Sequence, residues 1–287
     1  MMSQPIAYAL MAMICYGVCD FIYKQAASAG IRADHFLMVQ AWFFCSLVVL
    51  YALATGTIVF DPAALWGTLA GALAFVGFYY FIRSLVAGAV STNSSIFRLN
   101  FIVTVLLVVM LLGEPPTLRK VLGLAFALLA IWLLLGAGGP AADPAGGDAR
   151  RRSLLQVAVA TLAFGAANFF HTVGLRHGAV PETLAVAQAA VFMPLATVVV
   201  YRTDRKLRPP ATTFRYSAIA AILLVGATIF MLRSVAEGQA SVLVPIAQMG
   251  FIVAALLGIF VLRERITARK TVGLASALAA LAVLAGS

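Results

Sequence analysis

The chain has few charged residues, and this shortage excludes most classes of soluble protein. Only 10% of its 287 residues are charged, whereas 63% are hydrophobic and the mean hydropathy is +1.03. A soluble domain carries about 25% charged residues, so this composition cannot cover a water-facing surface. The sequence therefore predicts an all-α integral membrane protein, with the lipid bilayer as its main partner.

Several motifs of catalysis and energy coupling are also missing. The sequence contains no Gly-x4-Gly-Lys-Ser/Thr loop, no His-Glu-x-x-His, no Gly-x-Ser-x-Gly and no paired aspartates within a span. These absences argue against a nucleotide-powered pump and against an intramembrane enzyme. Cys15, Cys19 and Cys45 lack metal-binding spacing and are expected to be small buried residues. We expect no catalytic residue, no metal and no cofactor.

Acidic residues are outnumbered by basic ones, 10 to 20, which gives a net charge of +10. The basic residues lie in short connections between apolar segments, so we expect them to orient a membrane protein and not to bind nucleic acid. The segment 1–24 lacks the basic region and cleavage site of a signal peptide and is expected to be retained as a first span.

Long apolar runs are what the chain has in abundance, and runs near 20 residues are transmembrane candidates. The sequence predicts ten transmembrane helices, at 4–24, 34–54, 63–84, 90–112, 118–136, 154–173, 182–202, 213–233, 240–262 and 269–286. A Gly-, Pro- and Arg-rich linker at 137–153 divides the chain into two five-helix units, 1–136 and 154–287.

The two units repeat one another. Residues 77–136 fall on 227–286 without a gap at an offset of 150, with 23 of 60 positions identical. The first two helices match at an offset of 148, where Asp20 meets Asn168 and Gln40 meets Gln188. Since five spans are an odd number, the second unit must cross the membrane in the opposite sense. The sequence thus predicts two inverted-topology repeats, an architecture of secondary transporters with a midplane site between the halves.

Two motifs in each repeat resemble a known family. Each repeat opens with an aromatic-Gly pair, Tyr16-Gly17 and Phe164-Gly165, and closes with a Glu-x-x-Thr-x-Arg-Lys-x-x-Gly turn, at Glu114–Gly123 and Glu264–Gly273. These features are similar to the EamA-type members of the drug/metabolite transporter superfamily. The resemblance implies a ten-helix transporter of the cell (inner) membrane, with export as the expected direction, and it does not fix the substrate. Family members often carry Trp where this chain has Tyr16.

Two signals for orientation disagree. Fourteen basic residues lie in the connections 1–2, 5–6, 7–8 and 9–10, against three on the other side. The positive-inside rule then places both termini outside, whereas the family resemblance implies both termini inside. We follow the charge distribution here.

Ionisable residues within spans are expensive and are site candidates by default. Arg98 stands in the fourth span among polar neighbours that end in Asn100, and its repeat mate is the uncharged Gln248. In a wet cavity its guanidinium can bind a carboxylate or phosphate in bidentate fashion. The alternative is an arginine that snorkels or pairs structurally with an acid.

Asp20 is the second candidate. It shares a helix face with Tyr16 and Tyr23 at i, i+4 and i+7 spacing. A carboxylate in a cavity suits proton coupling, and the alternative is an i, i+4 pair with Lys24. Its mate Asn168 cannot titrate.

Further polar and aromatic residues complete the predicted site. The substrate-binding set is Arg98, Gln40, Gln188, Tyr79, Asn100, Gln248 and Tyr16, and the coupling set is Asp20 and His171. The alternatives are that Gln40 and Gln188 tie helices together, that His171 is a satisfied helix contact and that Tyr79 only packs. Pro245 is expected to kink the ninth helix. Arg83 and Arg233 are expected to snorkel, and Glu114 and Glu264 to fix loops.

One cation, one carboxylate, amides and aromatics suit a small zwitterion such as an amino acid. The sequence predicts a secondary transporter of this small-molecule substrate, proton-coupled or facilitative, that works by alternating access as a monomer or weak homodimer. Alternative substrates are drugs or quaternary amines and phosphorylated or nucleotide-sugar metabolites. An alternative of another class is a non-transporting membrane assembly protein.

Overall fold

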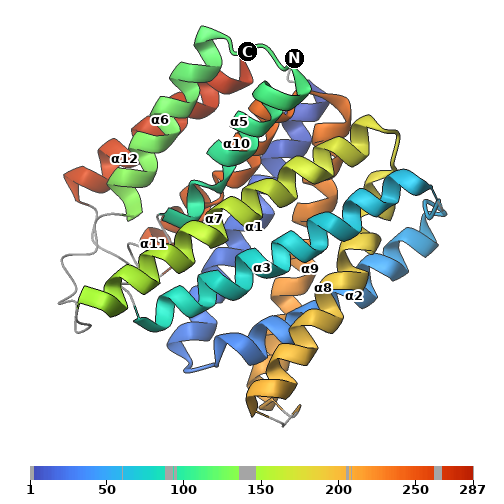
Figure 1. Cartoon of the computed structure of the whole chain (residues 1–287). Helices are drawn as coiled ribbons and strands as arrows, with labels where there is room; N and C mark the ends of the chain where they lie inside the picture. Colours follow the sequence, from blue (N-terminus) through green and yellow to red (C-terminus); the bar gives the residue numbers. More distant parts are fainter. Residues whose placement is uncertain are drawn as a thin grey trace.

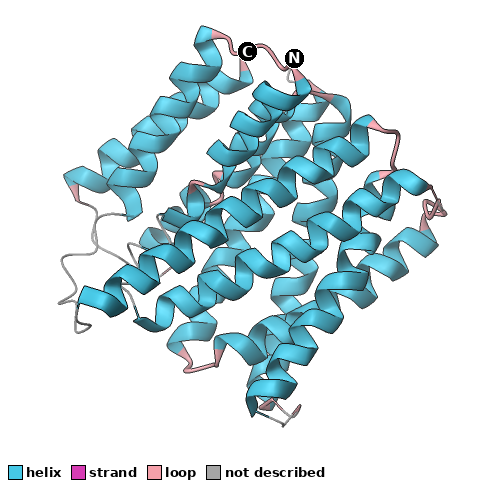
Figure 2. Ribbon diagram, in the orientation of Figure 1, coloured by secondary structure: helices cyan, strands magenta, loops and turns pink. Residues whose placement is uncertain are grey.

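The computed structural model describes residues 3–59, 61–87, 93, 96–135, 147–204, 207, 209–261 and 267–286. All regular structure in these ranges is helical (Figure 2). The elements are α1 (Gln4–Ser28), α2 (Ala33–Ala54), η1 (Pro62–Ala64), α3 (Leu65–Ala87), α5 (Asn100–Leu112), α6 (Leu118–Leu135), α7 (Gly147–Arg176), α8 (Pro181–Asp204), α9 (Ala211–Glu237), α10 (Ala240–Gln248), α11 (Phe251–Phe260) and α12 (Ala268–Ala285).

Most of these helices can cross a bilayer. Eight segments of the described chain are long and apolar enough, and a shorter apolar helix runs over Ile96–Leu112. Exposed leucines and aromatics, such as Leu118, Trp132 and Phe260, are 64–76% exposed. Such an outer surface fits lipid and not water. The chain is thus an all-helical integral membrane protein.

The helix ends follow local sequence signals. Pro5 stands in the first turn of α1, where its missing N–H costs no hydrogen bond. Gly113 ends α5 in the left-handed conformation, at φ 69°. Thr267 caps α12 by accepting from the Lys270 N–H at 3.3 Å. Helix α7 begins at Gly147, so the arginines at 150–152 are helical; residues 136–146 lie outside the described part of the chain.

Two helices are interrupted at positions that the repeat relates. A turn at Leu99 precedes α5, and a turn at Met249 and Gly250 separates α10 from α11. The predicted kink at Pro245 is therefore displaced: Pro245 lies inside α10, and the break follows four residues later. Its repeat mate Ser95 lies outside the described residues.

Close contacts hold both breaks. A Cβ on Gly17 of α1 would lie 2.4 Å from the Gly250 carbonyl oxygen and 2.4 Å from Val253 Cβ. In the other repeat, a Cβ on Gly165 of α7 would lie 2.6 Å from the Asn100 oxygen and 2.5 Å from Val103 Cβ. The glycine of each aromatic-Gly pair thus lets one helix rest directly on the broken helix of the other half.

The two halves pack on each other more than on themselves. Helices α1 and α2 of the first half pack on α9 of the second half, and their repeat mates α7 and α8 pack on α3 of the first half. The repeat mates α2 and α8 also pack on each other, as do α6 and α12. The α6–α12 and α2–α8 pairs stand at opposite edges of the bundle (Figure 1). This reciprocal pattern means that neither repeat forms a packed unit alone.

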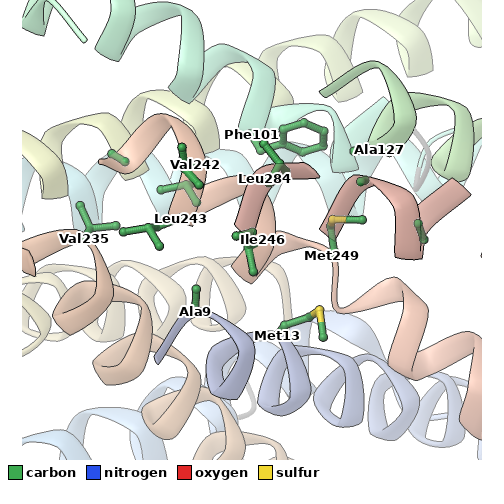
Figure 3. Close-up of a cluster of buried hydrophobic side chains, with 14 of the residues drawn as sticks. Ala9, Met13, Phe101, Ala127, Val235, Val242, Leu243, Ile246, Met249 and Leu284 are labelled. Atoms are coloured by element: carbon green, nitrogen blue, oxygen red, sulfur yellow. The ribbon is translucent and has the colours of Figure 1, made fainter. Parts of the chain in front are cut away.

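The main core lies around α10, of which every residue from Ala240 to Gln248 is buried. Its apolar side chains pack among residues of several other helices, among them Ala9, Met13, Phe101 and Leu284 (Figure 3). A short helix surrounded on all sides needs no polar face, which explains the apolar sequence of this segment.

Polar contacts identify the helix ends that meet on each side of the bundle. The start of α6 meets the end of α12 through Arg119 and the Gly286 carbonyl, and the start of α1 meets the end of α9 through the Pro5 carbonyl and Ser234. We call this side, which carries both termini (Figure 1), the terminus end. On the opposite side, Ser153 at the start of α7 donates to the Ser84 carbonyl near the end of α3 at 2.9 Å. We call it the linker end.

Candidate substrate site

Arg98 and Asp20 form an ion pair inside the bundle. The Arg98 Nη2 donates to Asp20 Oδ2, and the two side chains remain 22% and 18% exposed. Asp20 comes from α1, and Arg98 directly precedes the break at Leu99. Each charge offsets the desolvation of the other. The acid partner of Arg98 is therefore Asp20 itself, a link between two candidates that the sequence alone does not make.

A hydrogen-bonded amide flanks this pair. Gln40 Nε2 of α2 donates to the Tyr23 hydroxyl at 2.7 Å, and Tyr23 lies one turn beyond Asp20 on α1. Tyr16 and Cys19 on α1 lie within electrostatic range of Arg98. Tyr16 donates to Met231 Sδ at 3.6 Å and Cys19 to the Ala220 carbonyl at 3.6 Å, so both tie this face of α1 to α9 of the other half.

The equivalent positions of the second half form a neutral cluster. His171, the mate of Tyr23, is 5% exposed and lies beside Gln188, the mate of Gln40. Within the described residues, the two ring nitrogens of His171 and the Oε1 atom of Gln188 are buried and make no hydrogen bond of normal geometry. Buried polar atoms are normally paired, and Gln188 is the polar side chain next to the His171 ring. The cluster has capacity for a hydrogen-bonding ligand or water.

Asn100 lies at the helix break, and its side chain hydrogen-bonds to the backbone there. Its Nδ2 donates to the Phe97 carbonyl at 2.8 Å, which covers a carbonyl freed by the turn. Its Oδ1 accepts from Asn168 Nδ2 at 3.5 Å. The repeat mate of Arg98, Gln248, is 6% exposed at the end of α10. Asn100 therefore joins the neutral cluster to the break, next to Arg98 in the chain.

Two buried carboxylates form ion pairs at the terminus end. Glu182 at the start of α8 accepts from Arg233 Nη2 at 2.6 Å and Nε at 2.9 Å, and its side chain is 3% exposed. Arg233 also donates to the Tyr51 hydroxyl at 3.1 Å. The expectation that Arg233 snorkels is wrong, because a buried acid on the neighbouring helix holds its guanidinium.

Glu114 does more than fix a loop. It accepts from the backbone N–H groups of Ala240 and Ser241 at 3.1 and 3.0 Å, and so caps α10 of the other half. It also pairs with Arg176 at 2.7 Å. A carboxylate is stabilised at a helix N-terminus. Its mate Glu264 lies outside the described residues.

A model of the EamA-like transporter family matches residues 4–136 and 151–286. The chain belongs to this family. The match consists of two units that cover nearly the whole chain, in agreement with the repeat seen in the sequence. The family is one of membrane transporters of small molecules, and not of enzymes.

The EamA fold is also found among solved structures. One of them, described only as "Crystal structure of protein", aligns with a TM-score of 0.81 at 16% identity and covers 99% of this chain and 96% of its own. At this identity the likeness shows the fold alone. No curated protein matches the sequence.

Within this EamA chain, the predicted residues lie in two clusters, at the helix breaks and on α3. Asp20, Arg98, Gln40 and Tyr16 gather in the charged cluster, and His171 and Gln188 form the neutral one. Asn100 at the break contacts Asn168 of α7, and Gln248 is buried at the end of α10. Tyr79 is elsewhere: its hydroxyl accepts from Arg83 at 2.9 Å and its ring stacks on Phe75.

Three contributors are absent from the predicted site sets, namely Tyr23, Glu182 and Arg233. Two signals could have found them. Tyr23 lies on the Asp20 face of its helix. Glu182 and Arg233 are charged residues whose mates, Asp34 and Arg83, are also charged.

Proposed function

We propose that the chain is a secondary transporter of small zwitterionic metabolites, with amino acids as the best candidates and export as the direction. The observation that carries this proposal is the Asp20–Arg98 ion pair, which is partly exposed and flanked by the Tyr23–Gln40 hydrogen bond. The family membership supports transport of small molecules, and the chemistry of the pair supports the substrate class.

The proposal rests on charge balance. A substrate that carries a carboxylate and an ammonium group replaces one ion pair by two, with Arg98 on the carboxylate and Asp20 on the ammonium. No buried charge is then left alone, a situation that costs roughly 3–5 kcal/mol. A cation alone would leave Arg98 without a partner, and an anion alone would leave Asp20 without one. Drugs, quaternary amines and sugar phosphates are therefore alternative substrates of lower rank.

Binding to the purified protein tests this substrate class. We expect amino acids to raise the melting temperature of the detergent-purified protein by several degrees, because ligand at 100 times Kd stabilises the folded state by about 2.7 kcal/mol. Arg98→Gln and Asp20→Asn should each abolish the shift. Arg202→Gln, at an exposed arginine near the end of α8, is the matched control and should keep it.

Other ligands decide between the alternatives. A shift with quaternary amines or sugar phosphates, and none with amino acids, would overturn the zwitterion proposal but leave transport in place. A shift that survives in both Arg98→Gln and Asp20→Asn would separate the substrate from this ion pair. The absence of a shift with any ligand class would favour the assembly-protein alternative.

We further propose inverted topology and alternating access for the two repeats. Three observations support this. Helix α1 starts at the terminus end whereas α7 starts at the linker end. The helix breaks fall at related positions. The packing between halves is reciprocal. Asp20 and His171 are the candidate proton carriers, and one chain contains both halves of the site, so a monomer or a weak homodimer suffices.

Two ion pairs at repeat-related positions could alternate between the two states of the transporter. Glu182–Arg233 at the terminus end has its repeat mates in Asp34 and Arg83. In this structure those mates are bonded elsewhere: Asp34 to Arg32 at 2.7 Å and Arg83 to the Tyr79 hydroxyl at 2.9 Å. The Arg32–Asp34 pair is exposed, at 52% and 26%, and such pairs contribute little. We infer that the terminus end is closed here and that an Asp34–Arg83 pair forms when the linker end closes.

Thiol accessibility tests the switch. In a protein without its native cysteines, Ser241→Cys places a thiol at a position that is buried in this state. Glu182→Gln should raise its alkylation rate, about tenfold for each 1.4 kcal/mol lost by the closed state. Asp34→Asn should leave the rate unchanged or lower it. Glu237→Gln, at an exposed acid on α9, is the control. Equal increases in both variants would indicate general loosening and contradict the switch.

A further inference from the structure

A polar-apolar groove opens at the linker end, apart from the transport site. It has a volume of about 460 Å³ and is lined by Tyr80 of α3 and by residues of the first turns of α7, namely Asp148, Arg151, Arg152, Leu155, Gln156 and Val159. None of these residues has a role in the transport mechanism proposed above. The order of charged and apolar residues along its lining indicates which kind of ligand the groove could bind.

The wall changes from charged to apolar along one helix face. Arg151, Leu155 and Val159 follow one another at i, i+4 and i+8, so they form one row on α7. By length and composition, the candidate membrane span of this helix begins at Arg150. The guanidinium of Arg151 therefore stands at the membrane surface, and Val159 lies about 12 Å deeper along the axis. Leu155 and Val159 are 59% and 42% exposed, towards lipid.

The corner between the two helices is fixed. Asn93 Nδ2 donates to the Ser84 carbonyl at 2.7 Å and to Ser153 Oγ at 2.9 Å, and Ser153 donates to the same carbonyl at 2.9 Å. These buried bonds hold the end of α3 against the start of α7. The wall that Tyr80 forms thus keeps its position relative to the two arginines, which makes the groove part of the fold.

We propose that this groove binds one acidic phospholipid from the surrounding leaflet. The two guanidinium groups suit its phosphate, which they can bind in bidentate fashion. Leu155 and Val159 suit the start of an acyl chain. Asp148 and Gln156 can accept from hydroxyl groups, so a hydroxylated headgroup such as glycerol fits better than choline. Basic pockets between transmembrane helices on the anionic cytoplasmic leaflet have this chemistry, and the charge distribution places the linker end there.

Native mass spectrometry of the full chain in neutral detergent tests the site. The probes are phosphatidylglycerol and phosphatidylcholine with identical acyl chains, and inorganic phosphate as a competitor. We expect phosphatidylglycerol to be retained in preference to phosphatidylcholine, and Arg151→Gln/Arg152→Gln to weaken its binding roughly 25-fold, at about fivefold for each arginine. Arg215→Gln, at an exposed arginine of α9 outside the groove, should bind as the wild type does.

Each other outcome overturns the assignment. Equal retention of both lipids would mean that the groove does not recognise headgroup charge. Equal weakening in Arg215→Gln would mean that net charge and not the groove attracts the lipid. Competition by inorganic phosphate at the same concentration as lipid would reassign the groove to a soluble anion. Since Arg151 and Arg152 are exposed, the double variant should keep the wild-type melting temperature, which excludes a folding defect.

Discussion

At the scale of single residues, the glycines of the aromatic-Gly pairs stand where the packing leaves no room for a side chain. Gly17 and Gly165 allow backbone to meet backbone where α1 and α7 cross the broken helices. Small residues permit such approaches in membranes, where close van der Waals packing replaces the hydrophobic effect as the driving force. The aromatic-Gly signature therefore has a packing role that does not depend on the substrate.

Gly17→Ala should destabilise the protein. The new Cβ would lie 2.4 Å from a carbonyl oxygen and from a β-branched side chain, and neither can move away freely. Overpacking of this kind costs typically 1–3 kcal/mol. Gly226→Ala in α9 is the control, because its nearest neighbour would be 3.6 Å away and alanine favours a helix. Melting in detergent should fall for the first variant and hold or rise for the second; equal melting of both would contradict the proposed contact.

At the scale of helices, most of the fold could be predicted from the sequence. Apolar runs near 20 residues mark spans whatever their partners are, and the helices begin and end within several residues of the predicted limits. The breaks were harder. Met249-Gly250 and Leu99 carry no strong breaker apart from one glycine, and their position depends on α1 and α7 of the opposite half. A tertiary contact of this kind leaves no periodic signal.

The site residues could be predicted from the sequence one by one, but their partners could not. Asp20 and Arg98 are costly inside a membrane, so each could be found alone. Their pairing, and the contrast between the charged cluster and the neutral His171–Gln188 cluster, depend on which helices meet. The sequence therefore identifies candidate polar groups, whereas their partners on other helices can be found only from the packing of the helices.

At the scale of the whole molecule, the packing between halves explains how one chain could have two open states. Because α1 rests on α9 and α7 on α3, the two repeats exchange roles if the bundle rocks. The polar clusters differ between halves, with a charged pair in one and neutral groups in the other. Pseudo-symmetry of the helices with asymmetry of the chemistry allows the two states to differ in their affinity for a ligand.

Ala29 and His177 test inversion and orientation together, since both are exposed and are repeat mates at an offset of 148. In a protein without native cysteines, Ala29→Cys and His177→Cys place one thiol in each first connection. If the repeats are inverted, a membrane-impermeant maleimide applied to intact cells should label one of them only. The charge distribution predicts His177→Cys, since it places Ala29 in the cytoplasm. Labelling of Ala29→Cys alone would reverse the orientation, whereas labelling of both from outside would rule out inversion, provided that both are labelled in detergent.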